Sequence, residues 1–139
     1  MNSTELKRRT KLFGLTIINL IGQLPTTSAG RAIGNQLIRS GTAIGANYRA
    51  ACRAKSTADF IAKIDNVEEE ADESCYWLEL IVEGNLLNSE TVRPILKEAD
   101  ELTAIFTKVS KTAKANSQRY VAKEDIVEYV TATLDKELL

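Results

Sequence analysis

The stretch FIAKIDNVEEEADESCYWLELIV, residues 60–82, decides the fold class because its apolar residues return every three or four positions. This spacing places them on one side of an α-helix, which then has an apolar face to bury. The preceding Ser56-Thr57-Ala58-Asp59 is a capping-box-like start, and Gly84-Asn85 tolerates a left-handed helix end. The pattern therefore predicts a helix from Ser56 to about Val82. Its apolar stripe consists of Phe60, Ile64, Val67, Ala71, Cys75, Leu78 and Val82, and Trp77 and Ile81 widen it.

The same period recurs in three other segments, which we expect to be helices over residues 3–24, 28–53 and 89–115. Ser3 is the expected N-cap of the first, and Pro25 is expected to end it. The connecting segments are short, and no apolar-polar alternation supports a strand. The sequence therefore predicts an all-α protein, an antiparallel up-down-up-down four-helix bundle.

The chain is expected to divide into a bundle domain, residues 1–116, and a C-terminal extension, residues 117–139. Within the extension Ile126, Val130 and Leu134 recur at helical spacing and favour a short amphipathic helix. The apolar face of that helix would have to pack on its own bundle or on a neighbour.

The middle of the second expected helix, SGTAIGAN at residues 40–47, is unusually poor in large side chains. Two glycines inside a helix cost about 1 kcal/mol each relative to alanine. Close approach of another helix over Gly41 and Gly45 is the simplest compensation, and a kink at either glycine is the alternative. Ser40 and Asn47 lie seven residues apart on one face, so we expect them to hydrogen-bond across helices and fix the register.

The residue inventory argues against catalysis. The chain has no histidine, which removes the commonest general base and the commonest metal ligand. Neither a P-loop nor a dinucleotide-binding glycine turn is present, and two separated cysteines cannot build a structural zinc site. An acidic run wraps around its helix and is expected to be solvated or ion-paired, namely Glu68, Glu69, Glu70, Asp72 and Glu73. We expect no enzyme, no cofactor, no metal and no small-molecule substrate.

Cellular location follows from two features. The apolar segment at residues 13–24 is interrupted by Asn19 and Gln23, so neither a signal peptide nor a membrane span is expected. Cys52 and Cys75 cannot form a disulfide framework and indicate buried thiols in a reducing compartment. We therefore expect a cytoplasmic protein with no membrane partner.

Charge is unevenly distributed, although the net charge is only −1. Residues 1–63 carry ten Lys/Arg and two Asp/Glu, whereas residues 64–105 carry two Lys/Arg and twelve Asp/Glu. The basic half is suited to an anionic partner such as a phosphate backbone. Alternatively, the two halves neutralise each other between neighbouring helices or subunits. The candidate nucleic-acid-binding residues are Lys7, Arg8, Arg9, Lys11, Arg39, Arg49 and Arg53.

Three segments resemble the signature of the bacterial four helix bundle protein family, first noticed as reading frames within intervening sequences of large-subunit ribosomal RNA genes. They are QLIRSGTAIGANYRAACRA at residues 36–54, DFIAKI at 59–64 and EEADESCYWLEL at 69–80. The resemblance covers about residues 5–115. It implies an antiparallel bundle that assembles into a ring-like homopentamer, and it implies no settled activity.

A related group, the accessory proteins of diversity-generating retroelements, forms basic pentamers that bind a reverse transcriptase and nucleic acid. The resulting expectation is a non-enzymatic, pentameric protein that binds RNA, DNA or a nucleic-acid enzyme through its arginine-rich second helix. The alternative is an assembly or scaffold protein with protein partners only.

Overall fold

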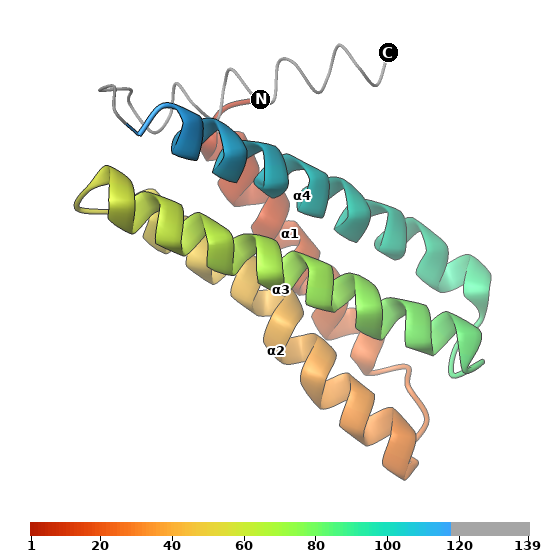
Figure 1. The fold of residues 1–139 in the computed structure, drawn as a ribbon. Coiled ribbons are helices and arrows are strands. Elements are labelled where there is room, and N and C mark those ends of the chain that lie inside the picture. Colours follow the sequence, from red (N-terminus) through yellow and green to blue (C-terminus); the bar gives the residue numbers. More distant parts are fainter. Residues whose placement is uncertain (118–139) are drawn as a thin grey trace.

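The predicted four-helix bundle is confirmed by a computed structural model, which describes residues 1–117. The helices are α1 (Ser3–Ile21), α2 (Ser28–Ala51), α3 (Thr57–Glu83) and α4 (Ser89–Ala115). They lie side by side with alternating direction (Figure 1), and residues 1–117 contain no strand. The helix expected within residues 124–138 lies outside the described residues, so the division at residue 116 stays a prediction.

The first predicted helix begins at the expected residue, Ser3, but its capping residue and its end differ from the prediction. Its N-cap is Asn2 rather than Ser3, because the Asn2 side chain accepts a hydrogen bond of 3.0 Å from the Glu5 amide. It ends at Ile21, three residues before the expected Leu24, and Gly22 is its C-cap. The chain has to leave the helical conformation before Pro25, which disfavours helix in the residue that precedes it.

The predicted start of α3 at Ser56 is confirmed, but the Asp59 side chain bonds a different amide from the one expected in a capping box. The Ser56 hydroxyl accepts a hydrogen bond of 3.0 Å from the Asp59 amide. The Asp59 carboxylate accepts in return from the Lys55 amide at 3.1 Å, one residue before the position of a standard capping box. After the helix, Asn85 takes the left-handed conformation at φ 55°.

The second helix ends at Ala51, two residues earlier than expected.

The core lies between all four helices and contains the apolar stripes predicted from their periodicity. Tyr48 of α2 and Phe106 of α4 meet at its centre, with ring centroids 5.3 Å apart. The stripe of α3 is buried as far as Leu78, after which Ile81 rather than Val82 is fully buried. Burial of such side chains contributes about 1.5–3 kcal/mol each and drives the association of the helices.

The four helices do not pack equally on one another. α2 packs closely on both α1 and α3, and α3 packs closely on α4, whereas α1 and α4 approach each other much less. The link between α1 and α4 includes a charged contact, in which Arg9 donates to Glu98 at 2.6 and 2.8 Å and to Glu101 at 2.7 Å. Thus α1 and α3 occupy opposite corners of the bundle.

Three glycines, Gly14, Gly41 and Gly45, form what we call the glycine seam between α1 and α2. A β-carbon on Gly41 would stand 2.8 Å from Cγ1 of Ile17, closer than real side chains approach. A β-carbon on Gly45 would stand 3.4 Å from the Thr10 backbone, and one on Gly14 would stand 3.7 Å from the Thr42 α-carbon. The small residues therefore permit near backbone-to-backbone contact between the two helices.

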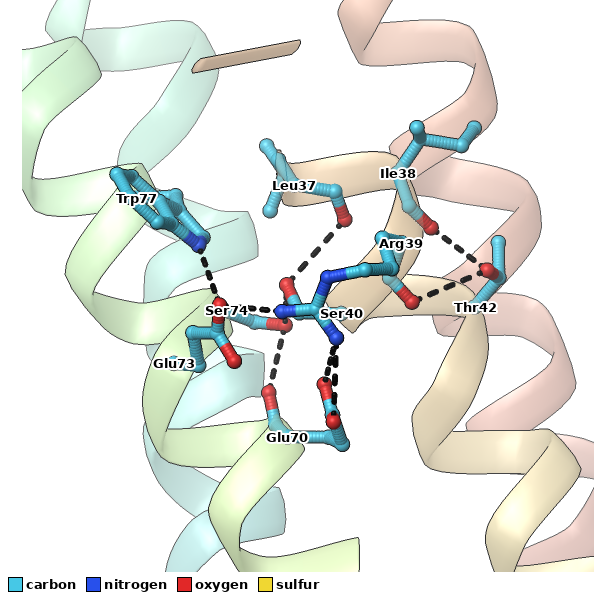
Figure 2. A network of polar contacts seen from close by, with 9 residues as sticks. All are labelled: Leu37, Ile38, Arg39, Ser40, Thr42, Glu70, Glu73, Ser74 and Trp77. Atoms are coloured by element: carbon cyan, nitrogen blue, oxygen red, sulfur yellow. Dashed lines mark hydrogen bonds and ion pairs between the residues drawn. The ribbon is translucent and has the colours of Figure 1, made fainter. Parts of the chain in front are cut away.

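A polar network connects α2 to α3 on the other side of α2 (Figure 2). The buried hydroxyl of Ser74 donates to that of Ser40 at 2.9 Å. Nearer to solvent, the Arg39 guanidinium lies between two carboxylates, donating to Glu70 at 3.1 and 3.2 Å and to Glu73. The Trp77 indole donates to Glu73 at 3.2 Å. This network fixes the rotation of α2 relative to α3.

The glycine seam can be tested by replacing two of its glycines with alanine. Both substitutions gain about 1 kcal/mol in helix propensity. Gly41→Ala should nevertheless lower the free energy of unfolding by about 1–2 kcal/mol, because overpacking against buried Ile17 outweighs that gain. Gly45→Ala should leave it unchanged or raise it by up to about 1 kcal/mol. Urea unfolding at fixed protein concentration, followed by circular dichroism, measures both, and equal effects would contradict the seam.

The Arg39–Glu73 pair makes stability depend on pH in a predictable direction. The Arg39 guanidinium, with help from the Trp77 indole, holds the pKa of Glu73 below its ordinary value of 4.5. A lowered carboxylate pKa stabilises the fold above the ordinary value, and the contribution disappears as pH falls through the lowered one. Glu73→Gln should therefore be less stable than wild type at neutral pH, with a difference that shrinks steadily below about pH 4.5.

The matched control is Glu79→Gln, an exposed carboxylate on the same helix that forms no ion pair with residues 1–117. The Glu73→Gln difference is compared with that of this variant, which removes one carboxylate charge from α3 without breaking an ion pair among residues 1–117. Thermal unfolding between about pH 3 and 7 measures the stability of wild type and of both variants. A Glu73→Gln difference that grows on acidification would contradict the expected direction.

Candidate nucleic-acid interface

The outer sides of α1 and α2 enclose a groove of about 720 Å³. Its walls are basic at one end, where Lys7 and Lys11 of α1 stand opposite Arg49 of α2 and Arg53 of the turn that follows α2. Small residues form the floor, and among residues 1–117 no acidic side chain lines the groove. They are Lys7, Arg8, Thr10, Lys11, Gly14, Leu15, Ile18, Thr42, Gly45, Ala46, Arg49 and Arg53.

Helical spacing and chain direction explain why these cations meet. Lys7 and Lys11 are four residues apart and lie on one face of α1, whereas Arg49 lies in the last turn of α2 and Arg53 in the turn that follows it. α1 and α2 run in opposite directions, which places the beginning of α1 beside the end of α2 (Figure 1). The glycine seam brings the helices close enough for the two basic pairs to share one groove.

Electrostatically, these groove cations differ from the other predicted basic residues. Lys7, Arg8, Lys11, Arg49 and Arg53 form no ion pair with any of residues 1–117. Like charges held in one concave site reinforce each other and raise the local attraction for anions. The groove can therefore attract a phosphate or carboxylate without first breaking an internal contact.

The two remaining candidates, Arg9 and Arg39, are turned toward acids of their own bundle. Arg9 forms the contact with Glu98 and Glu101 on α4, and these carboxylates raise the pKa of its guanidinium. The pKa of Arg39 is raised in the same way by Glu73 and Glu70 on α3. Internal pairing is thus confirmed for Arg9 and Arg39, whereas binding of an anionic partner by Arg49 and Arg53 stays a prediction.

The predicted polar and close-packing positions lie on the inner side of α2. Ser40 and Gly41 are buried, and Gly45 is half-buried in the floor of the groove. The hydrogen bond across helices that was expected of Ser40 is present, since its hydroxyl accepts from Ser74 of α3. Asn47 is half-buried and makes no hydrogen bond with its side chain in the part of the chain that the structure describes.

Sequence reasoning missed an apolar surface on α1. Leu12, Leu15 and Ile18 are exposed, although large aliphatic side chains in an amphipathic helix are normally buried. The available signal was their own spacing of three residues, offset from the buried stripe that contains Phe13 and Ile17. Leu15 and Ile18 extend the basic groove with an apolar end.

Other polar clusters offer no reactive group. Among residues 1–117, no three His, Cys, Asp or Glu side chains are placed to hold a metal ion. Cys75 donates to Asp100 at 3.2 Å, and burial raises the pKa of its thiol to about 12, so it stays protonated at neutral pH. Within the same range no helix is both long and apolar enough to cross a membrane.

Comparison with known proteins places the chain in a family. A family model described as 23S rRNA-intervening sequence protein matches residues 3–108. A solved structure from Bacteroides thetaiotaomicron, described as a protein with unknown function from the S23 ribosomal protein family, is similar with a TM-score of 0.71 and 35% sequence identity. The match covers 76% of this chain and 98% of that one. No curated protein matched the chain. The chain therefore belongs to the 23S rRNA-intervening sequence protein family.

Proposed function

We propose that this protein is a non-enzymatic homo-oligomer, a ring of five subunits, that binds the phosphate backbone of nucleic acid in the groove between α1 and α2. The observation that carries the proposal is the set of five cations that line this groove without an ion pair among residues 1–117 and without an acidic neighbour in the lining. Lysine and arginine side chains in such an arrangement are the usual partners of phosphate oxygens.

The lining of the groove also indicates which feature of nucleic acid is recognised. Within the described residues 1–117, it contains no aromatic side chain on which a base could stack and no asparagine or glutamine that could read a base edge. Phosphate contacts position a nucleic acid without reading its sequence. Binding should therefore tolerate different sequences and depend strongly on salt.

Assembly strengthens the proposal because symmetry multiplies a weak site. A backbone that spans grooves on two subunits binds far more tightly than one groove alone allows. The ring and its fivefold symmetry are supported by the family resemblance, and the family description, which names the intervening sequence of 23S rRNA, makes RNA the first probe to use.

A second candidate function is an assembly protein with protein partners alone. The exposed Leu12, Leu15 and Ile18 favour it, since apolar side chains on a surface usually mark a protein contact. In that case the groove cations would meet acidic side chains instead of phosphates. Direct binding measurements separate the two candidates.

The proposal predicts steep, salt-dependent binding of mixed-sequence RNA and duplex DNA to the full-length protein. Arg49→Gln/Arg53→Gln should weaken RNA binding at least about tenfold, because two charged hydrogen bonds are lost. The slope of log affinity against log salt should fall by about 1.4, since each lost single-strand phosphate contact contributes about 0.7. Fluorescence anisotropy at about 50 and 200 mM salt gives both quantities.

The matched control removes the same charge from α4 by Lys97→Gln/Lys111→Gln. Both lysines are exposed, and neither forms an ion pair with residues 1–117. Affinity and salt slope should stay close to those of wild type. Arg39→Gln, which breaks only the network with α3, should also retain binding. An equal loss in the α4 control would overturn the proposed site, and no binding at about 50 mM salt would leave the protein-only candidate.

A further inference from the structure

The apolar α1 stripe, which we define as Leu12, Leu15 and Ile18, is too exposed for a subunit that acts alone. These side chains are 62%, 54% and 51% exposed. Leu12 and Leu15 also line a second hollow of about 610 Å³ on the α4 side of α1, together with Arg8. The stripe therefore runs along the outward face of α1, where Arg8 and Lys11 outnumber the one acidic neighbour, Glu5, and it suits an occupant that is partly apolar and negatively charged.

α3 carries the complementary surface. Its outward face bears the acidic α3 stripe, defined as Glu69, Asp72, Tyr76, Glu79 and Glu83, whose members are all exposed and follow one another at spacings of three and four residues. Tyr76 is 52% exposed and is the only large hydrophobic residue outside the α1 stripe that is so open in residues 1–117. Its ring contacts the edge of Trp77 at a centroid distance of 5.1 Å, which holds it in place. Tyrosine in such a position is a common anchor of protein interfaces.

The placement of the two stripes determines how copies of the chain can meet. α1 and α3 occupy opposite corners of the bundle, so one copy cannot pair its own stripes. A contact between two different patches on opposite corners is heterologous, and its repetition produces a closed ring or an open filament. We infer that the α1 stripe of one subunit docks on the acidic α3 stripe of a second copy of this chain.

The inferred contact would bury the exposed apolar side chains of both stripes and pair their opposite charges. Leu12, Leu15 and Ile18 would cover Tyr76, while Arg8 would face carboxylates of the acidic stripe. Arg8 lines both hollows and would serve this contact, whereas Lys7, Arg49 and Arg53 line only the groove between α1 and α2. The inference rests on the assembly part of the proposed function, and it leaves the basic end of the groove open to phosphate.

The test uses opposite charges at one position of the full-length chain. Leu15→Asp places a negative charge against the acidic α3 stripe and should weaken assembly at least about a hundredfold, since like charges in an interface are strongly unfavourable. Leu15→Lys loses the same apolar side chain but faces acids, so it should weaken assembly less than about tenfold. Tyr76→Lys added to Leu15→Asp should restore part of the lost assembly. Dissociation constants come from light scattering over a dilution series.

Ala104→Asp, on the exposed side of α4, is the control for an added negative charge and should assemble like wild type. Circular dichroism shows whether each variant folds. A wild-type monomer at micromolar concentration would overturn both the assembly proposal and this inference. An assembled protein that Leu15→Asp and Leu15→Lys affect equally, or not at all, would overturn this inference alone. The stripe would then be covered by residues 118–139 or by a different partner, while nucleic-acid binding would be judged separately from the Arg49→Gln/Arg53→Gln data.

Discussion

The close approach of α1 to α2 across Gly14, Gly41 and Gly45 is the constraint on which the other features of this bundle depend. Without β-carbons along this seam, Ile17 can pack directly against the backbone of α2. Larger residues would separate the helices, because protein interiors tolerate little additional volume. The same proximity leaves a shallow floor outside the seam, between two rows of cations. Packing inside the bundle and electrostatics outside it are thus two consequences of one contact.

Whether an arginine forms an internal ion pair depends on the helix face on which it lies. Arg9 faces α4 and Arg39 faces α3, and each finds two carboxylates there. Arg49 and Arg53 point toward α1, which presents lysines instead of acids. A chain with a net charge of −1 can therefore still carry a strongly basic groove, because most of its acids lie on α3 and α4. The charge near a surface, rather than the net charge of the chain, decides which ligands that surface attracts.

The fold could be predicted from the sequence because helical periodicity and caps are local properties. The 60–82 stripe and the Ser56 cap indicated α3 almost to the residue, and Ser89 indicated the start of α4. The partners of individual cations could not be predicted, since the rotation of one helix against the next decides whether Arg39 or Arg49 meets an acid. The exposure of Leu12, Leu15 and Ile18 was equally hidden, because it depends on how little α4 covers α1. Both depend on tertiary packing, which periodicity does not specify.

The most direct measurement of the central claim is the reactivity of individual lysines in the presence and absence of RNA. Lys7 and Lys11 line the groove that the seam creates, whereas Lys97 and Lys111 lie exposed on α4. Limited acetylation followed by mass spectrometry compares all four lysines in a single sample of the full-length protein. If the α1–α2 groove holds the phosphate backbone, RNA protects Lys7 and Lys11 and leaves the α4 lysines reactive. Equal protection of all four lysines, or protection of Lys97 and Lys111 alone, would contradict it.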